Sequence, residues 1–333
     1  MTAATRLADA WYRPRLTALT ALLVPLSWLF GVAVGVRRAA YTLGLLRRRR
    51  VGRAVVVIGN LTVGGGGKTP ATIALARALG QRGAVPGIVS RGYGGAAVAP
   101  TAVRVGDDPA QVGDEALLLA ASGFPVVVGR DRAAAAAALI DANPRCTVIL
   151  CDDGLQHYAL ARDVEIVVVD GARGFGNGHL LPAGPLREPI ARLESVDAIV
   201  RLGVDGPVSA DARETTVTHR PLPFRRVIDD GGLADAVAAW RGLRVDAVAG
   251  IAHPQRFFAL LRSLGIDGDT RSFADHHAFV AADLPADADI VVMTQKDAVK
   301  CRRFADPRWY YLPIEAELDP RLVDRVQMLI GAA

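Results

Sequence analysis

Short apolar runs alternate with segments of helical periodicity along most of the chain. Few polar residues interrupt the runs at residues 54–58, 85–89, 126–128, 147–150 and 165–170. Such continuous runs are typical of strands that are buried on both faces of a parallel sheet. Apolar residues recur at helical spacing in residues 71–79, in residues 116–121 and in an alanine-rich stretch that ends at Ile140. This order predicts an α/β fold in which a parallel sheet carries helices on both faces.

The pattern changes near residues 213–232, where periodicity is lost and Thr, Pro and Gly accumulate. Beyond this stretch, residues 245–251 and 289–293 are predicted strands, and residues 254–264 are a predicted helix. We therefore expect a larger α/β domain over residues 51–225. A smaller C-terminal α/β domain over residues 226–333 is expected to close over its ligand site.

A long uncharged segment precedes the first predicted strand. Residues 16–36 contain no charged side chain, and a bilayer crossing needs about 20 residues. Arginines follow at positions 37, 38, 47–50 and 53, which favours a cytoplasmic flank in contact with anionic headgroups. Pro25 and Gly31 also permit a helix that lies in the membrane interface, and a helix buried in a soluble core is the third alternative. We predict that residues 1–50 form a hydrophobic, membrane-associated helical segment.

A glycine-rich loop joins the first predicted strand to the first predicted helix. It consists of Thr62, Val63, Gly64, Gly65, Gly66, Gly67, Lys68 and Thr69. The order strand, glycine loop, helix is that of a phosphate-binding loop (P-loop), because consecutive glycines let backbone N–H groups converge on an anion. Lys68 is expected to reach the phosphates and Thr69 to hold Mg²⁺. The strict motif has glycine where Thr62 stands, and a flexible glycine linker is the alternative.

Polar residues follow two further predicted strands. Asp152 and Asp153 come directly after residues 147–150, where a carboxylate can approach Mg²⁺ or its waters, although Asp-Gly turns are also common. Arg91 and Tyr93 lie in a glycine-rich loop after residues 85–89. Doubly wound sheets bind their ligands at this carboxyl edge.

Further candidates lie in helices and loops. Asp114 and Glu115 begin the helical run 116–121, which the helix dipole alone would explain. Arg187 lies in the Gly/Pro-rich segment 171–189, a long loop of the kind that often carries function, and it can pair with a phosphate or with a nearby acid. His276 and His277 are adjacent, so in an extended segment they point to opposite sides and a metal pair is not expected.

Composition narrows the class of protein. The net charge of +5 is modest for 333 residues, and no nucleic-acid partner or obligate protein partner is expected. Cys146, Cys151 and Cys301 show no C-x-x-C spacing, so the sequence indicates neither a zinc site nor a disulfide framework. A reduced, cytosol-facing chain is expected.

Several motifs occur together in one order along the chain. They are Gly59-Asn60-Leu61-Thr62-Val63-Gly64-Gly65 with Gly67-Lys68-Thr69-Pro70, Ser90-Arg91-Gly92-Tyr93-Gly94-Gly95, Gly113-Asp114-Glu115, Asp152-Asp153-Gly154-Leu155-Gln156-His157, Pro185-Leu186-Arg187-Glu188, Asp275-His276 and Lys296-Asp297-Ala298-Val299-Lys300. In these motifs the chain resembles the tetraacyldisaccharide 4′-kinases of the lipid A pathway in Gram-negative bacteria. Gly66 departs from the family, which usually carries a small hydroxyl residue there.

The resemblance implies a reaction and its participants. ATP and Mg²⁺ are the implied cofactors, and the implied acceptor is the 4′-hydroxyl of a tetraacylated glucosamine disaccharide 1-phosphate. The implied location is the cytoplasmic face of the bacterial inner membrane. Asp114 is the implied catalytic carboxylate with His276 as its partner, and Arg187 is implied to stabilise phosphate charge. Thr69, Asp152 and Asp153 are expected near the metal, and Arg91, Tyr93, Glu115 and His157 near the substrate.

Two alternatives remain at this point. One is another membrane-associated P-loop enzyme, of GTPase or ligase type, in which phosphate is released or an acyl phosphate forms. The other is a membrane-anchored, nucleotide-dependent regulator without chemistry of its own, for which Asp114 and His276 have no purpose.

Overall fold

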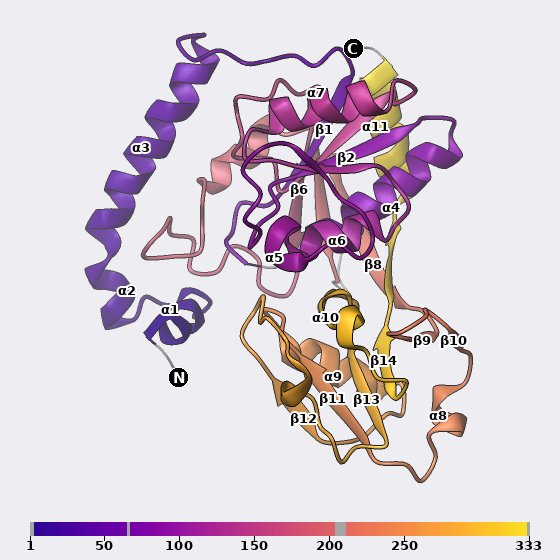
Figure 1. The fold of residues 1–333 in the computed structure, drawn as a ribbon. Coiled ribbons are helices and arrows are strands. Elements are labelled where there is room, and N and C mark those ends of the chain that lie inside the picture. Colours follow the sequence, from indigo (N-terminus) through magenta and orange to yellow (C-terminus); the bar gives the residue numbers. More distant parts are fainter. Residues whose placement is uncertain (1–2, 65–66, 204–210, 332–333) are drawn as a thin grey trace.

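Two sheets organise the protein, and the segment between residues 42 and 54 joins them to a group of N-terminal helices (Figure 1). The computed structural model describes residues 3–64, 67–203 and 211–331. Within these residues, the larger sheet has nine strands in the order β15-β8-β7-β6-β1-β5-β2-β4-β3. Its strands are β1 (Ala54–Gly59), β2 (Pro86–Ser90), β3 (Thr101–Ala102), β4 (Val126–Val128), β5 (Val148–Asp152), β6 (Val164–Asp170), β7 (Ala198–Leu202), β8 (Glu214–Pro221) and β15 (Ile314–Leu318).

The five strands predicted for this sheet are confirmed, and each runs parallel to its neighbours among them in the order β6-β1-β5-β2-β4. Strand β1 lies at the centre, and its side chains alternate between two apolar cores. Val56 and Ile58 pack on the side of the helices α4 and α6, whereas Val55 and Val57 pack on the side of α7. Helices therefore cover both faces, as the alternating pattern predicted.

The helices of this unit differ in the face that they cover. Those on the first face are α4 (Lys68–Gln81), α6 (Asp114–Ala120) and α11 (Pro320–Gly331), with the short α5 (Pro109–Val112) before α6. On the second face lie α7 (Arg132–Ala142) and the 3₁₀ turn η1 (Ile190–Ser195). Helix α4 begins directly after the glycine loop at the end of β1.

A smaller unit contains the second sheet, of six strands in the order β10-β9-β14-β13-β11-β12. Its strands are β9 (Phe224–Arg226), β10 (Gly232–Leu233), β11 (Val245–Ala249), β12 (Thr270–Ser272), β13 (Ile290–Thr294) and β14 (Trp309–Leu312). Its helical elements are α8 (Ala236–Ala239), α9 (Pro254–Ser263), α10 (Gln295–Cys301), η2 (Ala281–Asp283) and η3 (Arg302–Phe304). The predicted strands at 245–251 and 289–293 and the predicted helix at 254–264 correspond to β11, β13 and α9.

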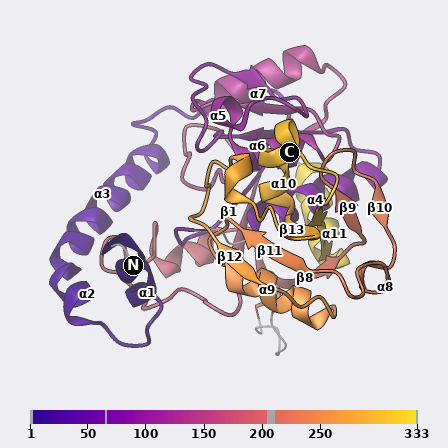
Figure 2. The ribbon, with the colours of Figure 1, turned by 60° about the horizontal axis from the view of Figure 1, so that its bottom comes forward.

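The chain crosses between the two units twice, at residues 221–224 and 312–314, and the N–H of Leu222 donates to Pro313 O across the pair of crossings. After the second crossing, β15 pairs with β8 of the larger sheet and α11 packs on the first core. Residues 314–331 therefore lie with the larger unit, although they are at the end of the segment 226–333. Helix α10 of the smaller unit lies against α6 of the larger one (Figures 1 and 2).

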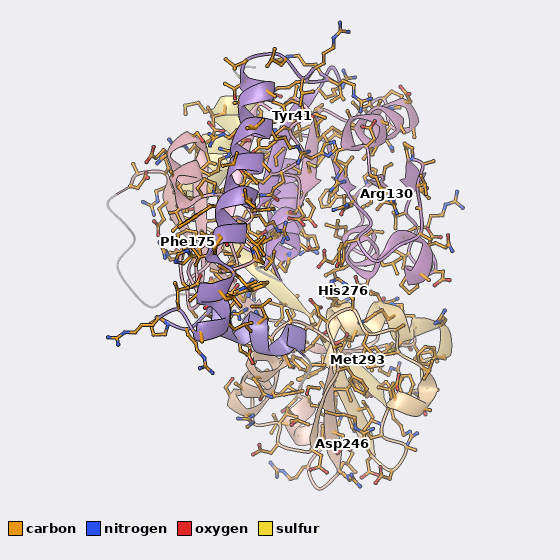
Figure 3. The ribbon with its side chains drawn as sticks, turned by 90° about the vertical axis from the view of Figure 1, so that its left-hand side faces the viewer. Tyr41, Arg130, Phe175, Asp246, His276 and Met293 are labelled. Carbon is orange, nitrogen blue, oxygen red and sulfur yellow. The ribbon has the colours of Figure 1, made fainter. Side chains whose placement is uncertain are left out.

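The N-terminal segment forms three helices, α1 (Ala3–Trp11), α2 (Ala18–Leu22) and α3 (Val24–Thr42), and α3 lies along the outside of the larger unit (Figures 1 and 3). The hydroxyl of Ser27 donates to Leu180 O at 2.7 Å, and the Trp11 indole donates to Pro182 O at 2.9 Å. Both contacts attach these helices to the long loop 171–189.

None of the helices in the described part of the chain is both long and apolar enough to span a bilayer. The uncharged run at 16–36 is divided, because α2 ends at Leu22 and α3 begins at Val24.

Candidate active site

A cavity of about 330 Å³ lies between the two units. The larger unit contributes Lys68 and Thr69 at the start of α4. The smaller unit contributes apolar side chains, among them Ile251, Phe257 and Leu260. One wall of the cavity is therefore polar and basic, and the other wall is apolar. This combination suits a molecule with a phosphate chain and a flat apolar ring.

Two glycines of the loop adopt backbone angles that other residues rarely adopt. Gly64 and Gly67 have φ angles of 100° and 71°, in the region that favours glycine. A β-carbon at Gly67 would stand 2.3 Å from Leu202 Cδ1, so no larger residue fits there without a shift. The N–H of Val63 donates to Pro185 O at 2.8 Å, and Thr62 forms an isolated bridge with Leu186. Gly65 and Gly66 lie outside the described residues.

Lys68 enters a polar cluster at the end of the sheet. Its side chain is only 8% exposed, and its Nζ lies 3.2 Å from Asn60 Oδ1 and 3.5 Å from Asp153 Oδ1. Arg187 donates to both carboxylate oxygens of Asp153, at 3.0 and 3.3 Å. Burial opposes ionisation of Asp153, but Lys68 and Arg187 outweigh it and hold its pKa below the usual value. Lys68, Asp153 and Arg187, which were predicted separately, are thus brought together.

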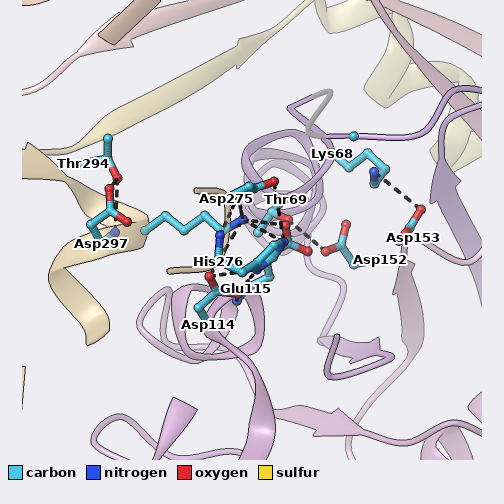
Figure 4. A network of polar contacts seen from close by, with 12 residues as sticks. Lys68, Thr69, Asp114, Glu115, Asp152, Asp153, Asp275, His276, Thr294 and Asp297 are labelled. Carbon is cyan, nitrogen blue, oxygen red and sulfur yellow. Dashed lines mark hydrogen bonds and ion pairs between the residues drawn. The ribbon is translucent and has the colours of Figure 1, made fainter. Parts of the chain in front are cut away.

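Asp152 lies at the end of β5 and is fully buried. Its two oxygens accept hydrogen bonds from the hydroxyls of Thr69, at 3.0 Å, and Thr72, at 2.9 Å. Burial, together with the nearby Glu115, raises the pKa of Asp152 to about 6. Figure 4 shows the Thr69–Asp152 and Lys68–Asp153 contacts side by side.

Substitution of Thr72 by valine tests how far this buried carboxylate depends on its donors. Valine keeps the shape of threonine but leaves one oxygen of Asp152 without a partner, so the free energy of unfolding should fall by about 1–3 kcal/mol. Urea unfolding measures the change. The matched control, Thr72→Ser, retains the hydroxyl, and equal destabilisation by both variants would contradict the prediction.

Asp114 and His276 meet (Figure 4), and His276 lies at the boundary between the two units (Figure 3). His276 Nδ1 lies 2.9 Å from Asp114 Oδ1 and 3.0 Å from Oδ2. Burial alone would raise the pKa of Asp114, but the His276 hydrogen bond and the ammonium groups of Lys296 and Lys300 outweigh burial and lower it. The hydrogen bond with Asp114 raises the pKa of His276, while burial and Lys296 oppose that rise. The pair therefore combines an ionised carboxylate with an imidazole whose proton affinity is increased.

The backbone decides which of the two histidines enters the site. His276 has a φ angle of 60°, and the N–H of His276 donates to the Asp275 carboxylate at 3.1 Å. The segment is a turn, so the expectation of an extended conformation is wrong at this point. His277 is directed to Asp283, 2.9 Å from its Nε2. A non-glycine residue at positive φ is uncommon and is often found at functional sites.

Four residues were predicted to lie near the substrate, and the structure places them at different sites. The Tyr93 ring packs on His276 with centroids 5.1 Å apart, and Glu115 Oε1 lies 3.2 Å from Lys296 Nζ. The ring of His157 instead accepts from the N–H of Arg132 at 3.4 Å, and burial lowers its pKa to about 4. Arg91 is exposed in its loop. Tyr93 and Glu115 thus join the Asp114–His276 cluster, whereas His157 faces the start of α7.

Sequence reasoning gave no role to several residues that the structure places here. Asn60 contacts Lys68, Thr72 contacts Asp152, and Gln156 accepts from Arg187 at 3.3 Å. Asn60 was visible as the polar residue that ends an apolar strand. Thr72 could not be recognised from the sequence, because a threonine within a predicted helix gives no sign of a function.

Comparison with known proteins agrees with this geometry. The sequence profile of the family described as tetraacyldisaccharide-1-P 4′-kinase matches residues 19–330. The chain belongs to this family. The relative named tetraacyldisaccharide 4′-kinase from Chromobacterium violaceum is 52% identical over 322 residues, covering 94% of each chain. That from Azoarcus sp. is 49% identical over 309 residues, covering 92% of this chain and 90% of the relative.

A solved structure extends the agreement to the fold. The crystal structure of the family member LpxK from Aquifex aeolicus, in complex with ATP, superimposes with a TM-score of 0.81 at 26% identity. The alignment covers 94% of this chain and 99% of that chain. The resemblance to the tetraacyldisaccharide 4′-kinases that the motifs indicated is therefore confirmed.

Proposed function

We propose that the chain transfers the γ-phosphate of ATP to the 4′-hydroxyl of a tetraacylated glucosamine disaccharide 1-phosphate, a step of lipid A biosynthesis. The observation that carries this proposal is the Asp114–His276 pair, which forms only where the two units meet and lies next to the cavity lined by Lys68 and Thr69. Membership of the tetraacyldisaccharide 4′-kinase family supports the reaction, and the relatives' names supply the acceptor.

Each site residue has a separate role in this phosphate transfer. A sugar hydroxyl is a weak nucleophile at neutral pH, so a carboxylate must accept its proton as the new bond forms. Asp114, ionised and held by His276, is the acceptor of that proton. Lys68 and the backbone N–H groups at the start of α4 hold the phosphate chain, and Arg187 stabilises charge on the transferred group.

A magnesium ion fits the donor set at the start of α4. The Thr69 hydroxyl and the carboxylates of Asp152 and Asp153 are the oxygen ligands that Mg²⁺ prefers, and Asp152 already orients Thr69. Within the described ranges no group of three or more His, Cys, Asp or Glu residues forms a metal site by itself. This fits an ion that is held largely by phosphate oxygens and water, and the ion would neutralise phosphate charge.

The division of labour follows the predicted domains. The larger unit would hold the phosphate chain, the smaller unit would line the apolar side of the cavity and bring His276 to Asp114, and residues 1–50 would face the membrane. The ion pair of Arg256 with Asp170, at 2.7 and 2.9 Å, supports a closed arrangement because it joins α9 to the end of β6.

The fate of the phosphate distinguishes the proposal from a GTPase or a ligase. With ATP labelled at the γ-position and purified tetraacylated disaccharide 1-phosphate, the label should move to the lipid and comigrate with a 4′-phosphorylated standard on thin-layer plates. Label released as free phosphate, or preferred use of GTP, would favour the alternative enzymes. Binding of ATP without turnover in the presence of lipid would favour a regulator.

We also propose that the N-terminal helices place the enzyme on the cytoplasmic face of the inner membrane. Large apolar side chains are exposed along α2 and α3, including Leu22 at 78%, Leu29 at 67% and Val36 at 64%. Leu29 and Val36 are seven residues apart in α3 and therefore lie on one face of that helix, and Leu22 ends α2 just before it. A lipid with four acyl chains leaves the bilayer only at a cost of about 0.8 kcal/mol per methylene, so the enzyme must approach it there.

Substitution of Leu22, Leu29 and Val36 by glutamine should reduce binding to anionic vesicles by about tenfold or more, because three large apolar contacts are lost. Sedimentation with vesicles measures the effect. The matched control replaces Val98, Val105 and Met328, which are also exposed, and should bind as the unmodified protein does. Unchanged binding of the first variant would mean that another surface attaches to the membrane.

A further inference from the structure

Lysine is almost absent from this chain. Of the 39 Lys and Arg residues, only three are lysines, at positions 68, 296 and 300. Lys68 belongs to the glycine loop, and the other two lie one turn apart on α10. Arginine presents a planar fork of donors, whereas lysine presents a compact ammonium on a flexible stem. The two groups are therefore not interchangeable at a site that holds one of them closely.

Both lysines of α10 approach the proposed proton acceptor. Lys296 Nζ lies 3.8 Å and Lys300 Nζ lies 3.9 Å from the same atom, Asp114 Oδ2. Lys300 has a structural partner of its own, because its Nζ lies 2.7 Å from Oδ1 of the fully buried Asp297. Lys296 differs, since all its partners belong to the site.

Lys296 joins the two units at the edge of the cavity. Its Nζ lies 3.2 Å from Glu115 Oε1 on α6 and 3.2 Å from Asp275 Oδ1 in the turn that carries His276. Its side chain is 16% exposed. Burial would lower the pKa of Lys296, but Glu115, Asp114 and Asp275 outweigh burial and raise it, so the group is an ammonium ion.

The same ammonium also determines the protonation of His276. Lys296 Nζ lies 3.4 Å from His276 Nε2, and an ammonium ion can only donate. This contact is a hydrogen bond only in the tautomer whose Nε2 carries no proton, because Nε2 must then accept. At the other side of the ring, the ionised Asp114 can only accept, so Nδ1 carries the proton. His276 is thereby held as the neutral tautomer that donates to Asp114.

We propose that Lys296 is a positioning residue of the kinase: by donating to His276 Nε2 it holds the neutral Nδ1–H tautomer, and it thus keeps the Asp114–His276 pair ready to accept the proton of the sugar hydroxyl. Because Lys296, Glu115 and Asp275 come from both units, this state forms only when the units are together. The inference rests on the proposed roles of Asp114 and His276. Lys296 acts through them.

Other polar and charged groups also face the Asp114–His276 pair and affect its titration. Tyr93 packs on the His276 ring, and Asp275 Oδ2 lies 3.7 Å from Nε2. Lys300 faces Asp114 from α10, and Asp108 and Arg303 lie on the cavity of about 180 Å³ that borders the pair on its other side. Within the part of the chain that the structure describes, Lys296 is the one among these cations that approaches the imidazole itself.

The test compares Lys296→Met with Lys296→Arg. Loss of the charge in Lys296→Met should let the pair bind a proton more readily, so the acidic limb of the pH profile of kcat/KM should move up by about one pH unit. The turnover number near neutral pH should fall by about tenfold, with KM for ATP nearly unchanged. Lys296→Arg keeps the charge, so its acidic limb should stay within a few tenths of a unit, while kcat falls because the fork does not fit. Arg262→Met, which removes an exposed cation on α9, is the matched control and should behave as the unmodified enzyme does.

A spectroscopic readout that needs no lipid accompanies the kinetics. In protein labelled with nitrogen-15 histidine, the His276 signals are those lost in His276→Gln. At neutral pH they should report an unprotonated Nε2 in the unmodified enzyme and a protonated or exchanging Nε2 in Lys296→Met. Thermal unfolding of every variant shows whether the fold is retained, and Lys296→Arg carries the test if Lys296→Met does not fold.

The outcomes separate the inference from the assignment beneath it. A raised KM for ATP with an unmoved acidic limb would make Lys296 a phosphate ligand and would overturn the inference. An unchanged Nε2 signal would also overturn it. If Asp114→Asn is inactive while both Lys296 variants match the unmodified enzyme, Asp114 is still assigned as the proton acceptor. Only the proposed role of Lys296 is then contradicted. If Asp114→Asn retains full activity, the proposed acceptor itself is wrong.

Discussion

Replacement of Asp114 by alanine is expected to lower kcat for lipid phosphorylation by a factor of about 10² or more, with little change in the affinity for ATP. Asp114 is buried and contacts His276, and it does not line the cavity that holds Lys68 and Thr69. Its loss therefore removes the proton acceptor and leaves the phosphate-binding groups in place. Transfer of labelled phosphate to lipid and calorimetric binding of ATP measure the two effects separately.

Asparagine at position 114 is the companion variant, because it keeps the shape of aspartate and removes its charge. We expect the same loss of turnover, which would assign the effect to the carboxylate rather than to a cavity. A collapse of ATP affinity in either variant would instead make Asp114 part of the nucleotide or metal site.

Replacement of Lys68 by alanine is expected to abolish detectable phosphorylation. Its ammonium is buried between Asn60 and Asp153, at the start of α4, where it can meet the phosphate chain. Removal would weaken binding of ATP, so KM for ATP should rise. It would also withdraw positive charge from the transferred group, so kcat should fall. Steady-state rates at saturating and limiting ATP distinguish the two contributions.

Lys68→Arg is the informative control for that experiment. It keeps the charge, but the guanidinium is larger than the pocket beside Asn60 that encloses a side chain only 8% exposed. We expect a partial recovery at most. Near-normal turnover of the alanine variant would refute the assignment of the glycine loop as the phosphate-binding site.

The sequence predicted well the parts of the fold that are decided locally. A strand buried on both faces must be apolar along its whole length, so β1, β2, β4, β5 and β6 were visible as continuous runs. The glycine loop and the first turn of α4 are consecutive in sequence, so Lys68 and Thr69 followed directly from the motif.

Strands β8 and β15, near the edge of the larger sheet, were not predicted, because neither is a continuous apolar run. Strand β8 contains Glu214, Thr216, His219 and Arg220, and such a mixed segment becomes a strand only through its partners. Those partners are β7 and the distant β15, which returns from the smaller unit. Pairing between segments that are remote in sequence leaves little trace in either segment.

For the site, the sequence by itself determined which chemical groups were available: a glycine loop, acids at strand ends, an acidic pair before a helical run and two adjacent histidines. Only the tertiary structure decided which of them meet. Asp114 and His276 are 162 positions apart, and the left-handed turn at His276 selects it over His277. The physical reason is that contacts between the two units depend on how α6 and α10 pack, and no local pattern encodes that packing.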